Sequence, residues 1–226
     1  MRLSVIIPTL NEERVVGATL DAIRGAAPAA EIIVADGGSM DHTVEVARTR
    51  GAQTLTTRRG RAFQMNAGAA AAECDTLVFV HADTRVPATF PSDIAGALAN
   101  SAIVGGRFDV EFDDSSFAPW LLAKLISLRS RVMRSATGDQ AIFVRRRVFE
   151  AMGGYTEINL CEDVDFARRL KRNGRVACLH SRVVTSARRW RQNGMIRTIL
   201  RMWLIKSLFL AGVSPAKLHR YYADVR

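Results

Sequence analysis

The chain has 226 residues, of which 48% are hydrophobic and 24% are charged, so it is long enough to bury a full core. Glycine and proline, with 16 and 6 residues, stand at ordinary levels, which argues against a disordered or fibrous protein. The formal net charge of +10 favours anionic partners: nucleic acid, anionic lipid or phosphate-bearing substrates. Charge alone does not choose among them.

The spacing of the cysteines and the lengths of the apolar runs indicate the cellular compartment of the protein. The three cysteines are widely spaced and follow no zinc or disulfide pattern, which favours a reducing compartment. The first apolar run breaks at Pro8 and is too short for a secretory signal. The longest run, 202–213, is interrupted by Lys206 and Ser207 and falls short of the roughly 20 residues of a membrane span. We therefore expect a cytoplasmic protein.

The first hundred residues alternate between strand-like and helix-like runs. Short continuous apolar runs predict buried strands, and apolar residues three or four apart predict helices. The expected elements are a strand at 3–7, a helix at 13–25, a strand at 31–35, a helix at 41–49, a strand at 52–56, a helix at 60–72 and a strand at 76–80. This alternation predicts a parallel, doubly wound α/β sheet.

After residue 100 the pattern becomes less regular. The expected elements are an extended segment at 104–112, a helix at 119–133, a strand at 141–144, a helix at 162–172, a strand at 176–179 and a long basic, apolar helix at 192–211. No repeat or linker interrupts the chain, so we expect one domain over 1–226. Within it, about 1–100 would bind a nucleotide, about 101–190 would bind an acceptor, and about 191–226 would add C-terminal helices.

Four polar clusters each follow a strand-like run: 8–13, 36–41, 81–83 and 161–163. In open α/β sheets, ligands bind in the crevice beyond the strand ends. Acidic and glycine-rich groups placed there repeatedly indicate a nucleotide and metal site.

The first two clusters also have structural interpretations. Thr9 and Glu12 fit a capping box at the start of a helix. Asp36 could bind a ribose hydroxyl or a base, with the adjacent glycines allowing close backbone approach to a ligand. The alternative is a tight turn in which Ser39 caps the next helix.

The later charged clusters carry two interpretations as well. The 81–83 cluster can hold Mg²⁺ or Mn²⁺ on a diphosphate, its histidine suiting Mn²⁺ better, or it merely ends a strand. Glu162 and Asp163 can supply a general base, or they are first-turn acids favoured by the helix dipole. The basic runs 58–61 and 188–191 can bind phosphate or lie solvated on the surface, and 188–191, with its tryptophan, can also contact nucleic acid.

Taken in order, these clusters resemble the inverting family-2 glycosyltransferases over nearly the whole chain. The likeness rests on 4–12, 36–43, 81–83, 162–163 and 189–190. More narrowly, the segments 59–61, 81–84, 138–143 and 186–190 resemble a bacterial subgroup, the radical-SAM/selenodomain-associated, arsenosugar-biosynthesis-type glycosyltransferases.

The resemblance implies a GT-A type fold: a Rossmann-like, mostly parallel sheet flanked by helices, with a C-terminal helical extension. It implies a nucleotide-diphosphate sugar donor, with a UDP-sugar preferred, and a divalent metal, Mn²⁺ or Mg²⁺, on Asp83. Asp163 matches the catalytic base, with Glu162 beside it. The positions implied to bind the donor, metal or acceptor are Pro8, Thr9, Asn11, Glu12, Asp36, Gly37, Gly38, Ser39, Arg61, His81, Asp83, Gln140, Arg189 and Trp190.

Two positions depart from the family motifs. His81 stands where the Asp-x-Asp motif has its first aspartate, which leaves the identity of the metal open. Ala187 stands where the Gln-x-x-Arg-Trp motif has its glutamine. Gln140 is then a candidate for a compensating contact near the acceptor.

The mechanism implied is a single displacement with inversion. Asp163 would remove the acceptor proton while the metal on Asp83, with Arg61 or Arg189, stabilises the departing diphosphate. One alternative is a nucleotidyltransferase, although the chain has no glycine-rich triphosphate loop with a following lysine near its N-terminus. Another is a non-catalytic nucleotide- or nucleic-acid-binding protein. Acids at the strand ends would repel a phosphate backbone, so we expect no nucleic-acid partner.

The helix expected from Gln192 places Arg197 and Arg201 one turn apart, with apolar side chains mostly elsewhere. Such a helix can lie on an anionic membrane, here at the inner face of the cell membrane, and bring the site to a lipid-linked acceptor. It can equally pack on the sheet or on a second subunit. The donor sugar, the acceptor and the oligomeric state stay open.

Overall fold

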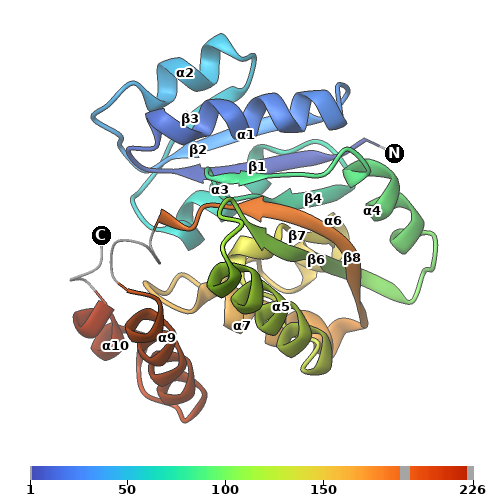
Figure 1. The fold of residues 1–226 in the computed structure, drawn as a ribbon. Coiled ribbons are helices and arrows are strands. Elements are labelled where there is room, and N and C mark those ends of the chain that lie inside the picture. The colour runs from blue at the N-terminus through green and yellow to red at the C-terminus, as the bar shows by residue number, and fades with distance from the viewer. Residues whose placement is uncertain (1, 189–193, 223–226) are drawn as a thin grey trace.

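Eight strands form one mixed sheet in the computed structural model, which describes residues 2–188 and 194–222 (Figure 1). The strands are β1 Ser4–Thr9, β2 Glu31–Asp36, β3 Gln53–Thr56, β4 Thr76–Phe79, β5 Thr84–Arg85, β6 Ile103–Phe112, β7 Ile142–Arg145 and β8 Arg175–Thr185. Their order across the sheet is β3-β2-β1-β4-β7-β6-β8-β5.

The first half of the sheet is parallel throughout, as the alternating pattern predicts. β3, β2, β1 and β4 pair in parallel, and β6 and β8 form a further parallel pair. β7 runs antiparallel to both β4 and β6, and β5 runs antiparallel to β8. The expected mostly parallel α/β sheet is therefore confirmed, with β7 inserted in the opposite direction between its two parallel parts.

Helices flank this sheet on both faces and extend beyond it. Their bounds are α1 Glu13–Ala26, α2 Thr43–Thr49, α3 Arg61–Ala71, α4 Phe90–Leu98, α5 Phe117–Val132, α6 Arg146–Ala151, α7 Glu162–Asn173, α9 Met195–Leu210 and α10 Pro215–Tyr222, with a 3-10 turn at Gly138–Gln140. The elements α4, α6, α10 and β5 were not predicted from the sequence. All four are short, so their apolar periodicity is carried by few residues.

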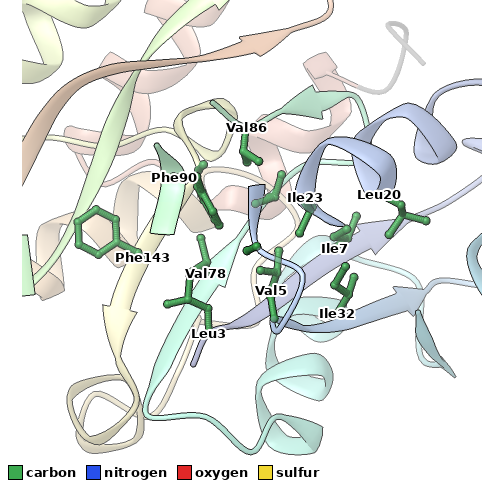
Figure 2. Packing of buried hydrophobic residues seen from close by; sticks show 14 of the residues in the cluster. Leu3, Val5, Ile7, Leu20, Ile23, Ile32, Val78, Val86, Phe90 and Phe143 are labelled. Atoms are coloured by element: carbon green, nitrogen blue, oxygen red, sulfur yellow. The ribbon is translucent and has the colours of Figure 1, made fainter. Parts of the chain in front are cut away.

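The strands alternate their side chains between two apolar layers. On β1, Val5 and Ile7 face one layer with α1 and α4, whereas Ile6 faces the other with α3 and α7. Figure 2 shows the first layer, in which Leu20 and Ile23 of α1 lie over these strand residues. Burial on both faces explains why the strands read as unbroken apolar runs.

The C-terminal helices α9 and α10 lie beside the lower part of the molecule in Figure 1, away from β1–β3. Ile205 of α9 and Leu218 of α10 are buried, so one side of each helix packs on the protein. The other side of α9 leaves Leu200, Trp203 and Leu204 exposed. Across the described ranges, 2–188 and 194–222, no helix has the length and apolarity needed to cross a membrane.

Candidate active site

The ends of β1 and β4 and the start of α7 border a cleft of about 740 Å³. Three of the four polar clusters line it, at 8–12, 81–83 and 161–163. Arg59, Gly60 and Arg61, at the start of α3, line it as well. The fold thus gathers groups that are up to about 150 residues apart in sequence into one site, as expected for strand ends of an α/β sheet.

The Asp36 cluster supports this cleft but does not line it. The buried Asp36 carboxylate accepts hydrogen bonds from Thr9 Oγ1 at 3.0 Å, Gly38 N at 2.9 Å and Ser39 N at 2.7 Å. Ser39 Oγ also donates to it. The capping interpretations of Thr9 and Ser39 are wrong, because the N-caps of α1 and α2 are Glu12 and His42 and neither helix has a side-chain cap.

The loop after β1 is fixed by neighbouring polar groups. Asn11 has a φ of 55°, a left-handed conformation that asparagine tolerates better than most residues. Its backbone N–H donates to Ser39 Oγ at 2.8 Å, and its side-chain Oδ1 accepts from Met40 N at 2.9 Å. Gln64, which the sequence analysis did not single out, donates from α3 to the carbonyls of Thr9 and Ala35 at 2.6 and 2.9 Å.

Charged side chains of both signs meet on one wall of the cleft. Glu12 pairs with Arg188 at 3.2 Å, and Arg61 lies 3.8 Å from Glu162. Burial raises the pKa of the Glu12 carboxyl, Arg188 opposes this rise, and nearby Asp83 adds to it. Glu12 and Asp83 are thus close enough to repel each other, and the two arginines offset this repulsion.

Asp163 is held at the start of α7 by backbone donors. Its Oδ2 accepts from Gly138 N at 2.8 Å, and its Oδ1 accepts from Val164 N at 2.7 Å. Cys161, at the N-terminal end of this helix, has a φ of 65°, which is rare outside glycine and asparagine. Burial, reinforced by Asp163 and Glu162, raises the pKa of the Cys161 thiol to about 12.

Gly138 joins the two ends of the site. A Cβ at this position would stand 2.4 Å from His81 Nε2, so His81 packs directly against the Gly138 backbone. The Gly138 N–H is also the donor to Asp163. The strand-end cluster at His81 and the carboxylate at Asp163 therefore contact the same glycine from different directions.

Further charged groups line the cleft that the sequence analysis did not select for the site: Arg129, Asp139 and Lys206. In the sequence, Lys206 stands out only as an interruption of an apolar run. Gln140, by contrast, is fully buried beside the cleft, where its Oε1 accepts from Ser130 and Thr137.

The remaining positions of the implied site divide into three groups. Pro8, Asn11 and the residues at 81–83 line the cleft. Gly37, Gly38 and Ser39 lie outside its lining, in the turn that Asp36 builds. Arg189 and Trp190 fall outside the described residues. In the part of the chain that the structure describes, no three or more His, Cys, Asp and Glu side chains gather into a metal-binding group.

Solved structures share this architecture. A mannosyltransferase from Pyrobaculum calidifontis, solved with GDP-Man and Mn²⁺, superposes with a TM-score of 0.68 at 20% identity, covering 96% of this chain and 68% of that one. S. aureus TarS with UDP-GlcNAc superposes at 0.66 and 19% identity over 82% of this chain. The chain spans 58% of that TarS structure. The fold is of the GT-A type.

The family follows from the sequence itself. Residues 4–152 match the family "Glycosyl transferase family 2", and the chain belongs to this family. A "PGL/p-HBAD biosynthesis glycosyltransferase" of Mycobacterium tuberculosis is 29% identical over 199 residues, covering 81% of this chain and 75% of that protein. The protein is a glycosyltransferase, and the expected family is confirmed.

Proposed function

We propose that this glycosyltransferase moves a sugar from a nucleotide-diphosphate donor to an acceptor hydroxyl with inversion. The observation that carries the proposal is the placement of Asp163, whose carboxylate two backbone N–H groups orient in the cleft that Asp83 also lines. Similar folds are solved with UDP-GlcNAc and with GDP-Man, which supports a nucleotide-sugar donor. A UDP-sugar stays the preferred donor, and the acceptor is not specified.

Asp163 acts as the general base in this proposal. It takes the proton from the acceptor hydroxyl as that oxygen attacks the anomeric carbon, and the bond to the diphosphate breaks on the opposite face. No second carboxylate nucleophile is required, which suits inversion. Glu162 is buried and paired with Arg61, so it positions that arginine toward the donor side.

Asp83 is the residue that would hold a divalent metal. Mg²⁺ and Mn²⁺ are commonly bound by one or two carboxylates together with substrate phosphates, so a single aspartate beside a diphosphate fits this mode. His81, which also lines the cleft, would offer a nitrogen ligand that suits Mn²⁺. When bound, the metal would neutralise charge on the leaving diphosphate. Mn²⁺ is present with the similar P. calidifontis enzyme.

A thermal-shift panel tests the donor site. UDP, GDP, their sugar conjugates and the triphosphates are each added with and without Mn²⁺ or Mg²⁺. One diphosphate and its sugars should stabilise the protein in a metal-dependent way, by about 2.7 kcal/mol at 100 times the dissociation constant.

Paired variants control the panel. Asp83→Asn should lose the metal-dependent part of the stabilisation. Asp93→Asn, which changes a half-buried aspartate of α4 bonded to Thr89, should keep this stabilisation. No response of the parent protein to any diphosphate would refute the donor assignment.

We also propose that α9 rests on an anionic membrane surface. Trp203 is 63% exposed beside exposed Leu200 and Leu204, and Arg197 is exposed on the same helix. Apolar side chains flanked by cations, with a tryptophan among them, suit the interface of an anionic bilayer. The C-terminal half of the cleft is lined by Met202 and Trp203, so this surface reaches the site. The inner face of the cell membrane stays the proposed location.

Vesicle flotation tests this contact. The protein should float with vesicles that contain phosphatidylglycerol. The Trp203→Ser variant should no longer float with them. Met40→Ser removes an apolar side chain that is 93% exposed elsewhere and should float normally. Equal flotation of both variants would exclude α9 as the contact.

The narrower likeness to the radical-SAM/selenodomain-associated, arsenosugar-biosynthesis-type group rests on sequence segments alone. We keep it as a proposal about the acceptor pathway class. Transfer to an arsenic-containing acceptor, measured by mass spectrometry of the product, would support it, and transfer only to other acceptors would remove it.

A further inference from the structure

Two basic side chains enter the cleft beside Asp163 from helices far apart in the chain. Arg129 comes from α5 and Lys206 from α9, and both line the cleft together with Asp139. Lys206 Nζ and Arg129 Nε are buried and have no hydrogen-bond partner among the described residues. The Arg129 guanidinium does donate from Nη2 to Ser130 Oγ, at 3.5 Å.

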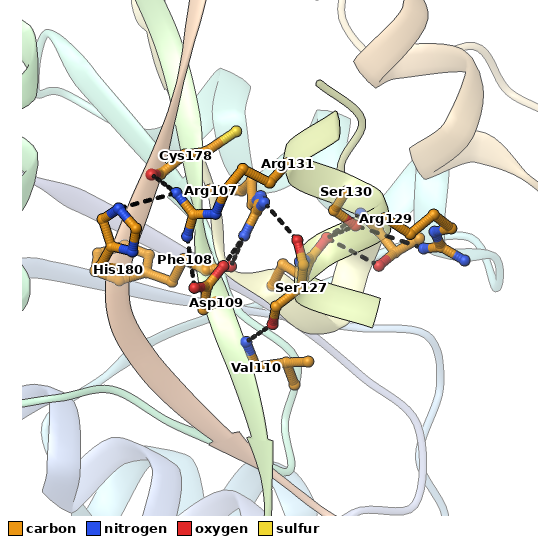
Figure 3. A network of polar contacts seen from close by, with 12 residues as sticks. Arg107, Phe108, Asp109, Val110, Ser127, Arg129, Ser130, Arg131, Cys178 and His180 are labelled. Carbon is orange, nitrogen blue, oxygen red and sulfur yellow. Dashed lines mark hydrogen bonds and ion pairs between the residues drawn. The ribbon is translucent and has the colours of Figure 1, made fainter. Parts of the chain in front are cut away.

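Two neighbouring arginines, unlike Arg129, have a carboxylate partner within the protein. Arg107 and Arg131 both pair with the Asp109 carboxylate, the latter at 2.6 Å. Arg107 also donates to the carbonyl of Ser127. Figure 3 shows this group, with the Arg129 side chain extending away from it past Ser130. Arg129 is therefore on the same helix as a paired arginine but points to a different place.

The electrostatic surroundings of Lys206 make its position costly without a further anion. Burial lowers the pKa of the Lys206 ammonium, and Arg129 lowers it further. Asp163, Cys161 and Asp139 act in the opposite direction, without a hydrogen bond to Nζ. A buried cation that lacks hydrogen bonds and faces a second cation is unfavourable in the free protein.

The Lys206 group has different nearby charges from those around Glu12. The charged neighbours of Glu12 are Arg188, Asp83 and Arg61. The neighbours of Lys206 are Arg129, Asp163, Cys161 and Asp139. Arg61 also pairs with Glu162, next to Asp163, so Arg129 and Lys206 form a second basic group of the same cleft, near the proposed base.

We propose that Arg129 and Lys206 bind an anionic group of the acceptor, a phosphate or a carboxylate, and so place the adjacent hydroxyl at Asp163. This inference rests on the proposed transfer to a hydroxyl. Both side chains line the cleft, so an anion bound there can pair with their charged groups, and hydrogen bonds from charged donors are the stronger kind. The acceptor class is therefore an anionic hydroxyl compound.

Ligand-observed NMR titrations test the subsite on the full-length protein. Methyl phosphate, acetate and methanol serve as the phosphate, carboxylate and neutral probes. The protein is first saturated with the diphosphate that stabilises it, together with Mn²⁺, so that the donor subsite is filled. We expect one or both anions to bind and methanol not to bind. The stronger of the two anions identifies the acceptor group.

Variants locate the bound anion. Arg129→Gln and Lys206→Met should each weaken anion binding at least tenfold. Lys124→Gln and Arg134→Gln remove exposed cations on α5 and just after it and should leave anion binding unchanged. Equal affinity in all four variants would overturn the subsite. If Arg61→Gln or Arg188→Gln lowers anion binding instead, the anion binds on the donor side, and the proposed subsite is overturned as well.

The two proposals fail separately. If a diphosphate stabilises the protein but neither anion binds, the acceptor subsite is wrong and the donor site stands. If no diphosphate binds, yet Lys206→Met abolishes anion binding, the subsite stands and the donor assignment fails. Circular dichroism of each variant confirms that the fold is intact.

Discussion

The two sides of the cleft are built differently. On the β1–β2 side, polar groups satisfy one another: Asp36 accepts four hydrogen bonds, and Gln64 bridges the carbonyls of two strands. On the α5–α9 side, Arg129 and Lys206 carry buried nitrogen atoms without a hydrogen-bond partner in the described part of the chain. The polar groups on the β1–β2 side have their hydrogen-bond partners within the protein, whereas those on the α5–α9 side would gain partners from a bound ligand.

Residues that stabilise the fold and residues that bind a ligand therefore lie on different sides of the cleft. Removing a group from a satisfied network leaves its partners buried and unpaired, which destabilises the fold. Removing a group that has no partner relieves an existing cost and removes only the ligand contact. Changes on the β1–β2 side should therefore lower stability, and changes on the α5–α9 side should lower function.

Asp163→Asn gives the largest expected effect and should separate function from stability most clearly. The amide keeps an oxygen for the Gly138 N–H but cannot accept the acceptor proton. Transfer should fall by about 10²–10⁴-fold, the usual contribution of a general base. Nucleotide affinity should stay near that of the parent, and stability should fall by no more than about 1–3 kcal/mol, because the NH₂ group then faces the Val164 N–H.

Steady-state transfer and nucleotide titration measure this effect. Asp165→Asn is the matched control, because Asp165 lies on the same helix but bonds to Arg169 and Thr156. Its rate should stay within a few-fold of the parent. Retention of most activity by Asp163→Asn would remove the base assignment.

Asp36→Asn should act chiefly on stability. The amide can keep its oxygen toward the N–H groups of Gly38 and Ser39, but its NH₂ group then faces the hydroxyls of Thr9 and Ser39, which donate to the carboxylate in the parent protein. We expect a loss of about 1–3 kcal/mol in the free energy of unfolding. Urea denaturation measures it, and an unchanged midpoint would contradict the view that this side is held by its own hydrogen bonds.

Gly138→Ala tests the residue that links the two sides. The added methyl would meet His81 Nε2 at 2.4 Å and Cε1 at 2.7 Å, so the imidazole or the loop must move. Overpacking of this kind costs about 1–3 kcal/mol. Gly96→Ala, where an added methyl group would have no other atom within 4 Å, should be neutral or slightly stabilising.

A double variant sharpens this test. His81→Ala removes the ring that the new methyl meets, so Gly138→Ala should cost less in the His81→Ala background. The difference between the two backgrounds, measured by thermal unfolding, is the coupling between the residues. Equal costs in both backgrounds would show that the clash is not the cause.

The strand ends of the site could be predicted from the sequence because apolar runs, and the polar residues that end them, are local features of the chain. Continuous apolar runs located β1, β2 and β4 to within a few residues, and the polar residues after β1 and β4 line the cleft. Local patterns could not decide what Thr9 bonds to. Its partner, Asp36, is 27 residues away, and only the parallel pairing of β1 with β2 brings the two together.

The site residues on the α5–α9 side could not be predicted from the sequence for a related reason. A single lysine in an apolar helix looks like a solubilising interruption, and an arginine near the end of α5 looks like a favourable dipole contact. Lys206 becomes a site residue only because α9 folds back on the cleft, which depends on packing of side chains such as Ile199. That packing leaves no periodic signal near residue 206.

Lys206→Met is the smallest expected effect and the sharpest test of the comparison, because it should raise stability. Folding lowers the pKa of the Lys206 ammonium, so the charged form is disfavoured in the folded protein. This cost is fully present below the folded-state pKa and disappears as pH rises through the unfolded-state pKa. Methionine has a similar length and no charge, so thermal unfolding at pH 7 should show a gain of about 1 kcal/mol, or about 2–4 °C for a chain of this size.

The gain should shrink as pH is raised toward 10, whereas Arg197→Gln, which removes an exposed cation from the same helix, should show no such trend. A loss of stability in Lys206→Met at pH 7 would mean that the lysine is satisfied within the protein, and the two sides of the cleft would then be built alike.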